Sequence, residues 1–194
     1  MNFDYPEGAT PIDPDEARGL LLPHIRKRAE LDRWEQENIS EAEDTVLRRK
    51  QKDILTEKYA RNLHKKMFGT VWRWAGDFRR SQKNIGIEWM QVPVALHQLF
   101  QEVNGWLEYN SYPPDEIAAR FHHRLVAIHA FANGNGRHAR LMADVLLVHL
   151  LGRERFSWGQ ENLTNAGECR HRYIVALQAA DRHDYGPLLA FVRS

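Results

Sequence analysis

The residues with the clearest chemical potential lie in one stretch, His129-Ala-Phe-Ala-Asn-Gly-Asn-Gly-Arg-His-Ala-Arg140. Gly134 and Gly136 permit a backbone with positive φ, so several N–H groups can face one point. The stretch leads into a predicted helix, and the N-terminus of a helix attracts anions. Arg137 and Arg140 lie three residues apart and therefore on one face of that helix. This pattern predicts a polyphosphate site.

His129 stands at the mouth of the same loop, where a histidine can act as a general base with a pKa near working pH. The two arginines oppose the dipole of the helix that follows, so a bound polyanion explains them better than stability does. Phe131 is expected to anchor the loop in the core. A base, an amide nest and paired guanidinium groups within twelve residues favour chemistry at a bound polyphosphate.

The flanking sequence predicts helices that hold this loop. Pro113-Pro114-Asp115-Glu116 is a helix-start signal with acidic residues in the first turn. Apolar residues then recur at helical spacing as far as Ile128. A second helix, from about Arg137, is apolar nearly all round and is expected to be the buried centre of a bundle. A last helix is predicted to start with Asn165 as its cap.

The N-terminal half also favours helices. Residues 1–19 are predicted to be an extended lead-in, and residues 20–194 a single domain. Ser40 with Glu43 fits a capping box and predicts that a helix restarts there. A further helix is expected to end near Gly69, because apolar residues before it repeat every four positions.

Residues 70–95 differ, since β-favouring aromatic and branched side chains alternate with glycines. They predict one short β-hairpin around 80–92.

Composition sets limits on the function. The chain has 194 residues, a formal charge of +1 and a single cysteine, Cys169. One cysteine excludes a disulfide framework, a four-cysteine zinc site and a redox pair. The balanced charge argues against direct nucleic-acid binding, and no segment is apolar enough to span a membrane. A cytoplasmic protein is expected. No His-Glu-x-x-His occurs, and adjacent His122 and His123 project about 100° apart on a helix, so no zinc site is expected.

The pattern H-x-F-x-x-G-N-G-R-x-x-R over residues 129–140 resembles the signature of the Fic (filamentation induced by cyclic AMP) domain family. The resemblance extends through Trp72-Arg-Trp-Ala-Gly-Asp-Phe-Arg79 and Asn84-Ile85-Gly86, and covers roughly residues 20–190. It implies an all-α fold, a Fic-fold helical bundle with one small β-hairpin flap at 80–92.

The opening of the chain, Asp-Tyr-Pro-Glu-Gly-Ala-Thr-Pro at residues 4–11, resembles the subgroup called mobile mystery protein B. That subgroup occurs on mobile bacterial elements beside a helix-turn-helix protein. The resemblance implies a toxin–antitoxin-like setting with such a companion protein, and it allows a homodimer.

The family resemblance implies transfer of AMP from ATP to a Ser, Thr or Tyr hydroxyl of a target protein. His129 would take the hydroxyl proton, and Asn135 with the loop amides of Gly134 and Gly136 would hold the α-phosphate. Arg137 would contact the β- and γ-phosphates and Arg140 the γ-phosphate. The flap, including Asn84, Ile85 and Gly86, would pair with the target's backbone.

Asn133 departs from the family pattern, because active members usually carry Asp or Glu there. That carboxylate helps to hold Mg²⁺, and an amide oxygen contributes no net charge. The departure leaves three alternatives open: an adenylyltransferase of full or weakened activity, a nucleotide-binding regulatory module that acts with a partner protein, and use of another nucleotide donor.

A helix near residues 29–39 resembles the family's inhibitory helix. Glu37-Asn38 matches the Glu-(Gly/Asn) part of its motif, although Arg33 stands where Ser or Thr is expected. The hypothesis is that Glu37 pairs with Arg140 and blocks the γ-phosphate. The alternative is that Glu37 lies on a solvated helix face.

Overall fold

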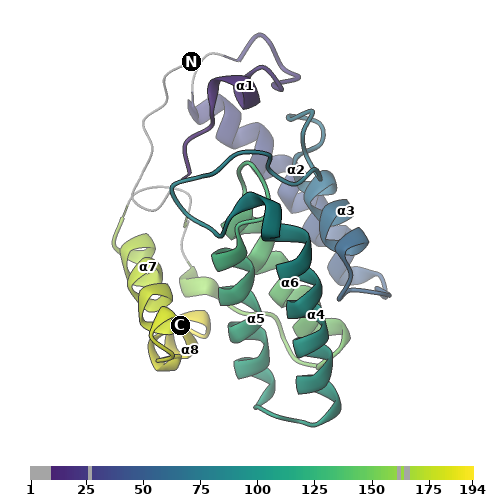
Figure 1. The fold of residues 1–194 in the computed structure, drawn as a ribbon, viewed down its shortest axis with the longest axis vertical. Helices are drawn as coiled ribbons and strands as arrows, with labels where there is room; N and C mark the ends of the chain where they lie inside the picture. Colours follow the sequence, from purple (N-terminus) through teal and green to yellow (C-terminus); the bar gives the residue numbers. More distant parts are fainter. Residues whose placement is uncertain (1–9, 26–27, 161–162, 164–166) are drawn as a thin grey trace.

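The computed structural model describes residues 10–25, 28–160, 163 and 167–194 (Figure 1). Helices follow one another along the described chain, and short turns or irregular segments join them. The elements are α1 (Pro14–Ala17), α2 (Arg28–Arg48), α3 (Glu57–Phe68), the 3₁₀ turn η1 (Trp89–Gln91), α4 (Val92–Glu108), α5 (Pro114–Ile128), α6 (Asn135–His149), the 3₁₀ turn η2 (Trp158–Gln160), α7 (Glu168–Asp181) and α8 (Gly186–Val192).

Helix α6 is the centre of the bundle. It packs against α5, α2 and α3, and α4 covers the other side of α5 (Figure 1). Its side chains are buried nearly all round because apolar residues occupy most of its faces, as the sequence predicted. Helices α7 and α8 pack on each other at one side of the bundle. The all-α expectation is therefore confirmed. Helices α5 and α6 flank the loop at residues 129–134, which begins with His129.

The predicted helix boundaries are met in two places and missed in one. Helix α3 ends at Phe68, directly before Gly69, and α5 begins at Pro114. The restart at Ser40 is wrong, because α2 continues unbroken through it and the Ser40 hydroxyl lies 3.5 Å from Gln36 Nε2. A single buried stripe, Leu31–Ile39–Val46, keeps that helix whole. Asn165, the predicted cap of the last helix, lies outside the described residues.

The predicted β-hairpin around 80–92 is also wrong. The described residues form no β-strand and contain two isolated bridges, Leu20–Trp72 and Phe78–Phe131. The buried guanidinium of Arg79 explains this, because it takes carbonyls that a ladder would need. Its Nη1 donates to Ser81 O at 2.9 Å and its Nη2 to Ile87 O. Residues 79–88, here called the 79–88 segment, therefore wrap around Arg79 instead of pairing as strands.

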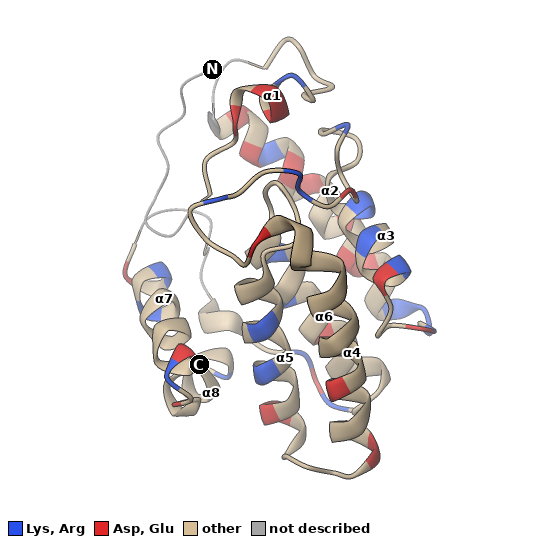
Figure 2. Ribbon diagram, in the orientation of Figure 1, with Lys and Arg blue, Asp and Glu red and all other residues tan. Residues whose placement is uncertain are grey.

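Charged residues of both signs lie along α2 and α3 (Figure 2). Within α2, for example, Arg48 pairs with Asp44 at 3.2 Å. No helix in the described part of the chain is both long and apolar enough to span a membrane.

Candidate nucleotide site

The loop between α5 and α6 has an unusual backbone at both ends. His129 ends α5 with φ +55°, and Gly134 precedes α6 with φ +78°. A Cβ atom on Gly134 would lie 2.6 Å from the ring of Phe68, so only glycine fits there. The first N–H groups of α6, on Asn135, Gly136 and Arg137, have no carbonyl one turn earlier in the helix and remain for a ligand.

The underside of this loop is fixed by buried hydrogen bonds. Asn135 accepts from the N–H of Phe131 at 2.8 Å and donates to the carbonyl of Phe131 at 2.8 Å. Phe131 is buried, as predicted, and stacks on His64 with ring centroids 3.8 Å apart. His64 Nε2 in turn lies 3.0 Å from the Asn133 carbonyl oxygen. The Asn135 side chain therefore shapes the loop, and its backbone N–H is the group left for a phosphate.

His129 is buried, with 6% of its surface exposed, and its Nε2 lies 2.8 Å from the hydroxyl oxygen of Thr10. Burial lowers the pKa of His129 to about 4, against the opposing effect of the Val126 carbonyl, and the charges of Arg79 and Lys83 lower it further. The sequence predicted a pKa near working pH, whereas the ring is neutral throughout that range. A neutral imidazole can accept a proton from a hydroxyl group.

Arg137 is held by residues from two other helices. Its Nη1 lies 2.6 Å from Glu35 Oε2, and its guanidinium carbon lies 4.9 Å from the centre of the Phe68 ring. Glu35 is 2% exposed and also accepts from Trp72 Nε1 at 2.6 Å. One guanidinium edge is thus engaged by α2, while Nη2 lies 3.5 Å from Asn133 Oδ1.

Arg140 lies beside Tyr173 of α7, with its guanidinium carbon 5.8 Å from the centre of that ring. Burial lowers the pKa of Arg140, while Tyr173 and Asp144 raise it. Because arginine keeps its charge in proteins, this is a partly buried cation. Among the described residues, it forms no ion pair with a carboxylate. Such a cation at a helix N-terminus suits an incoming anion.

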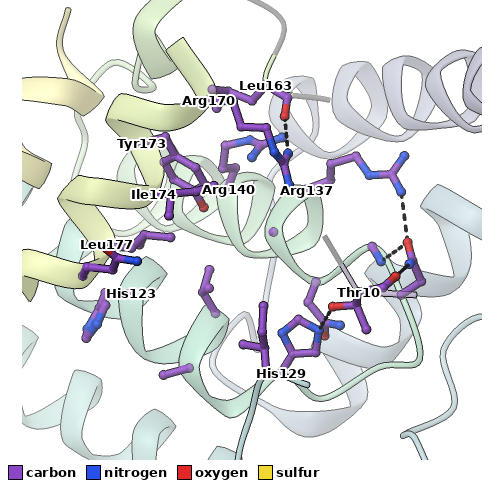
Figure 3. Close-up of a pocket in the computed structure, with 18 of the residues that line it drawn as sticks. Thr10, His123, His129, Arg137, Arg140, Leu163, Arg170, Tyr173, Ile174 and Leu177 are labelled. Atoms are coloured by element: carbon purple, nitrogen blue, oxygen red, sulfur yellow. Dashed lines mark hydrogen bonds between the residues drawn. The ribbon is translucent and has the colours of Figure 1, made fainter. Parts of the chain in front are cut away.

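These groups line one cavity of about 380 Å³, within the usual range for small-molecule sites of about 300–1,000 Å³ (Figure 3). The structure brings together eight of the predicted site residues: Ile85, His129, Asn133, Gly134, Asn135, Gly136, Arg137 and Arg140. Ile85 reaches the cavity from the 79–88 segment. Gly86 lies against His129, since a Cβ on Gly86 would be 2.6 Å from His129 Cβ.

Glu37 is not brought to this cavity. It lies on the outer face of α2, paired with Arg33 at 3.2 Å, and its side chain is 57% exposed. The predicted pair between Glu37 and Arg140 is therefore wrong. Glu35, two residues earlier on the opposite face, is the acidic residue that reaches the motif. Its signal in the sequence was its place within the apolar stripe Leu31–Ile39–Val46, where a carboxylate needs a buried partner.

Thr10 is the second residue at the cavity that the sequence analysis did not single out. It belongs to the predicted extended lead-in and to the run at residues 4–11, but nothing in that run indicates a place beside His129. Only the folded chain brings it to His129, which lies 119 residues away in sequence.

Asn133 and its neighbours do not provide a set of protein ligands for Mg²⁺. Asn133 Oδ1 accepts from the Gly134 N–H at 2.7 Å, and Asn133 Nδ2 donates to the Thr10 carbonyl at 2.8 Å. The carboxylate that lines the cavity, Asp181, lies 2.8 Å from His123 Nε2. The described residues contain no group of three or more His, Cys, Asp or Glu that could hold a metal ion.

Comparison with known proteins agrees with the fold and the loop. Residues 54–147 match the model of the Fic/DOC family. The chain is 31% identical over 144 residues to protein adenylyltransferase Fic of Aedes aegypti, and 33% identical over 146 residues to that of Drosophila willistoni. These alignments cover 72% and 73% of this chain, but only 27% and 28% of the relatives' length.

Solved structures are similar over more of the chain. The N-terminal Fic domain of a putative cell filamentation protein from Bartonella quintana gives a TM-score of 0.70 at 16% identity, and covers 88% of this chain and 84% of that one. BepC from Bartonella tribocorum, solved with bound AMPPNP, gives 0.68 at 17% identity, with 87% of each chain covered. The molecule is an all-α protein with the Fic fold. The chain contains a Fic/DOC family domain.

Proposed function

We propose that this chain is a protein adenylyltransferase that transfers AMP from ATP to a hydroxyl side chain of a target protein. The observation that carries this proposal is the neutral, buried imidazole of His129 at the edge of a cavity that the N-terminus of α6 and two arginines also line. The relatives named protein adenylyltransferase Fic support it. The chain spans little more than a quarter of their length, so target and activity are proposed here.

In the proposed reaction, the N–H groups of Asn135 and Gly136 hold the α-phosphate, and Arg137 and Arg140 hold the β- and γ-phosphates. The target hydroxyl gives its proton to His129 Nε2 as its oxygen attacks the α-phosphorus. The bond between the α-phosphorus and the bridging oxygen breaks, and pyrophosphate leaves. The chain's contribution is positioning and charge stabilisation by groups already fixed before ATP binds.

The target would approach over the 79–88 segment. Ile85 lines the cavity and Gly86 lies against His129, so a chain that follows Asn84-Ile85-Gly86 would present its hydroxyl to the imidazole. This segment lacks β structure in the free protein, and we propose that it offers backbone groups to an extended target only on binding. Mg²⁺ would be ligated by the phosphates of ATP, whose charge it neutralises, because Asn133 supplies no carboxylate.

A second function has one observation in its favour. The carboxamide oxygen and nitrogen of Asn133 both form hydrogen bonds within the protein, and the hydroxyl of Thr10 contacts His129 Nε2. A protein in this state binds nucleotide and transfers little AMP. It would then act as a regulatory module with a partner, such as the helix-turn-helix companion expected from the sequence.

The two functions are separated by incubating the full chain with α-labelled ATP, Mg²⁺ and cell lysate. The transferase predicts labelled protein that disappears with His129→Ala and persists with His97→Ala, a matched change at an exposed histidine of α4. Saturable ATP binding without labelled protein would instead support the regulatory module. Labelling that survives His129→Ala would contradict the proposed role of this residue.

A further inference from the structure

The N-terminal segment, defined here as residues 10–20, reaches the cavity through Thr10. Thr10 is 6% exposed and lines the cavity together with His129 and the loop (Figure 3). Two polar contacts hold it. Its hydroxyl oxygen lies 2.8 Å from His129 Nε2, and its carbonyl accepts from Asn133 Nδ2 at 2.8 Å. The second contact requires an amide at position 133, because a carboxylate would repel the carbonyl.

Anchors further along the segment fix Thr10 without involving the site. Lys83, from the 79–88 segment, lies 2.6 Å from Asp13 Oδ2 and 2.6 Å from Glu16 Oε2, with its own side chain only 3% exposed. Ser81 also donates to Asp13 at 3.1 Å. Near the end of the segment, the carbonyl of Gly19 accepts a hydrogen bond from the backbone N–H of Arg73 at 2.8 Å. These contacts hold the N-terminal segment in place, and the Thr10 hydroxyl therefore lies at His129.

That hydroxyl satisfies the requirements for a substrate of the proposed reaction. It is an aliphatic alcohol within hydrogen-bonding distance of Nε2 of a neutral imidazole, beside the amides expected to hold a phosphate. Being part of the same chain, it has no association cost, and its effective concentration at the base is set by the fold. No target protein needs to be present for this encounter.

We propose that Thr10 is an intramolecular acceptor, so that the protein adenylylates its own N-terminal segment. This inference rests on the proposed function. The hydroxyl proton of Thr10 passes to His129 Nε2 while Thr10 Oγ1 forms a bond to the α-phosphorus of ATP. The bond from that phosphorus to the bridging oxygen breaks, and its electron pair leaves with pyrophosphate. The products are a threonyl phosphodiester of AMP and pyrophosphate.

The test uses the purified full chain with α-labelled ATP and Mg²⁺, followed by intact mass and peptide mapping. One AMP per chain is expected, on the peptide that contains Thr10. The rate constant is expected to be unchanged on dilution of the protein, because both reacting groups belong to one molecule. An observed first-order rate constant that rises in proportion to protein concentration would show reaction between molecules and would overturn the proposal.

Variants locate the acceptor. Thr10→Val removes the hydroxyl at nearly constant volume and should lower self-labelling to the level of His129→Ala. Thr10→Ser keeps a hydroxyl and should retain self-labelling, which separates loss of the acceptor from loss of folding. Ser81→Ala removes a different hydroxyl, the one that donates to Asp13 of the N-terminal segment, and should leave the label on Thr10. Labelling of Thr10→Val equal to wild type would refute the assignment.

The same samples distinguish the two levels of the argument. Labelled lysate proteins without label on Thr10 would overturn this inference and leave the proposed function standing. Absence of label from both the chain and the lysate, with active controls, would overturn both.

Discussion

The floor and the cover of the cavity are built from different interactions. The floor is the loop and first turn of α6, residues 129–140, where buried rings and a closed carboxamide pair fix the backbone. The cover is the N-terminal segment with the 79–88 segment, joined by ion pairs to Lys83 and by the contacts of Thr10. Groups that need fixed geometry thus sit on apolar packing, whereas groups that a ligand must displace are held by exchangeable polar contacts.

The largest expected effect is a change of folding stability with pH. It tests whether the buried imidazoles in the floor and in the adjoining helix α5 are neutral. Burial lowers the pKa of His122 to about 3, and those of His129 and His138 to about 4, against about 6.5 in an unfolded chain. The unfolded state therefore binds more protons between pH 6.5 and 4, and stability falls as pH falls through this window. Each histidine loses about 2 kcal/mol by pH 5.

Asp144 opposes this trend. Burial raises its pKa to about 7, so the folded state binds the extra proton between pH 3.8 and 7, and this contribution to stability is lost as pH rises. Burial also lowers the pKa of His64, which acts in the same direction as the other three histidines, so the free energy of unfolding is at least about 3 kcal/mol lower at pH 5 than at pH 7. Urea unfolding at both pH values measures it. Equal stability would contradict the buried neutral state of these rings.

The two glycines of the loop give the next largest effect. Gly134→Ala should lower the free energy of unfolding by about 2–4 kcal/mol, because a left-handed residue acquires a Cβ against Phe68. Gly136→Ala is the matched control, since its Cβ would have no neighbour closer than Arg140 Nη1 at 3.9 Å. It should change stability by less than about 1 kcal/mol while weakening ATP binding, because the methyl group enters the phosphate cavity. The reverse ranking in thermal unfolding would be incompatible with the loop described here.

A substitution of Glu35 tests whether its ion pair with Arg137 competes with the binding of phosphate. In Glu35→Gln the amide can still accept from Trp72, but it no longer holds Arg137 by charge. ATP affinity, measured by calorimetry, should rise about tenfold, which corresponds to about 1.4 kcal/mol. Glu37→Gln changes an exposed residue of the same helix and should have no effect. Weaker binding by Glu35→Gln would mean that Glu35 orients Arg137 for the phosphates.

Asn133 joins floor and cover, and its substitution should have the smallest effect. Asn133→Asp removes the donor to the Thr10 carbonyl and supplies a carboxylate for Mg²⁺. Half-maximal labelling of lysate proteins should need a few-fold less metal than in the wild type, because the charge attracts the ion. An unchanged metal dependence over a wide concentration range would count against this role of position 133.

Local sequence predicted the floor well. Two spaced glycines, a histidine and two arginines define the loop in twelve consecutive residues, and the apolar surface of α6 predicts its central position. These features depend on neighbours in sequence, so pattern and propensity capture them. The β-favouring residues near 80–92 misled, because the buried Arg79 takes carbonyls that a hairpin would use.

The cover could not be predicted in the same way. Thr10 meets His129, and Lys83 meets Asp13, only when distant parts of the chain fold together. The choice of Glu37 over Glu35 shows a related difficulty. The motif pointed to one glutamate, but the helical face decided which of the two is buried.

The central claim is that the N–H groups at the start of α6 grip the phosphates of a nucleotide. Its most direct measurement is a titration of the ¹⁵N-labelled chain with ATP, observed through backbone amide signals. The signals of Asn135, Gly136 and Arg137 are expected to shift most, and AMP should shift them less than ATP does. Unchanged signals at these three residues when ATP is saturating, with shifts elsewhere in the molecule, would contradict the claim.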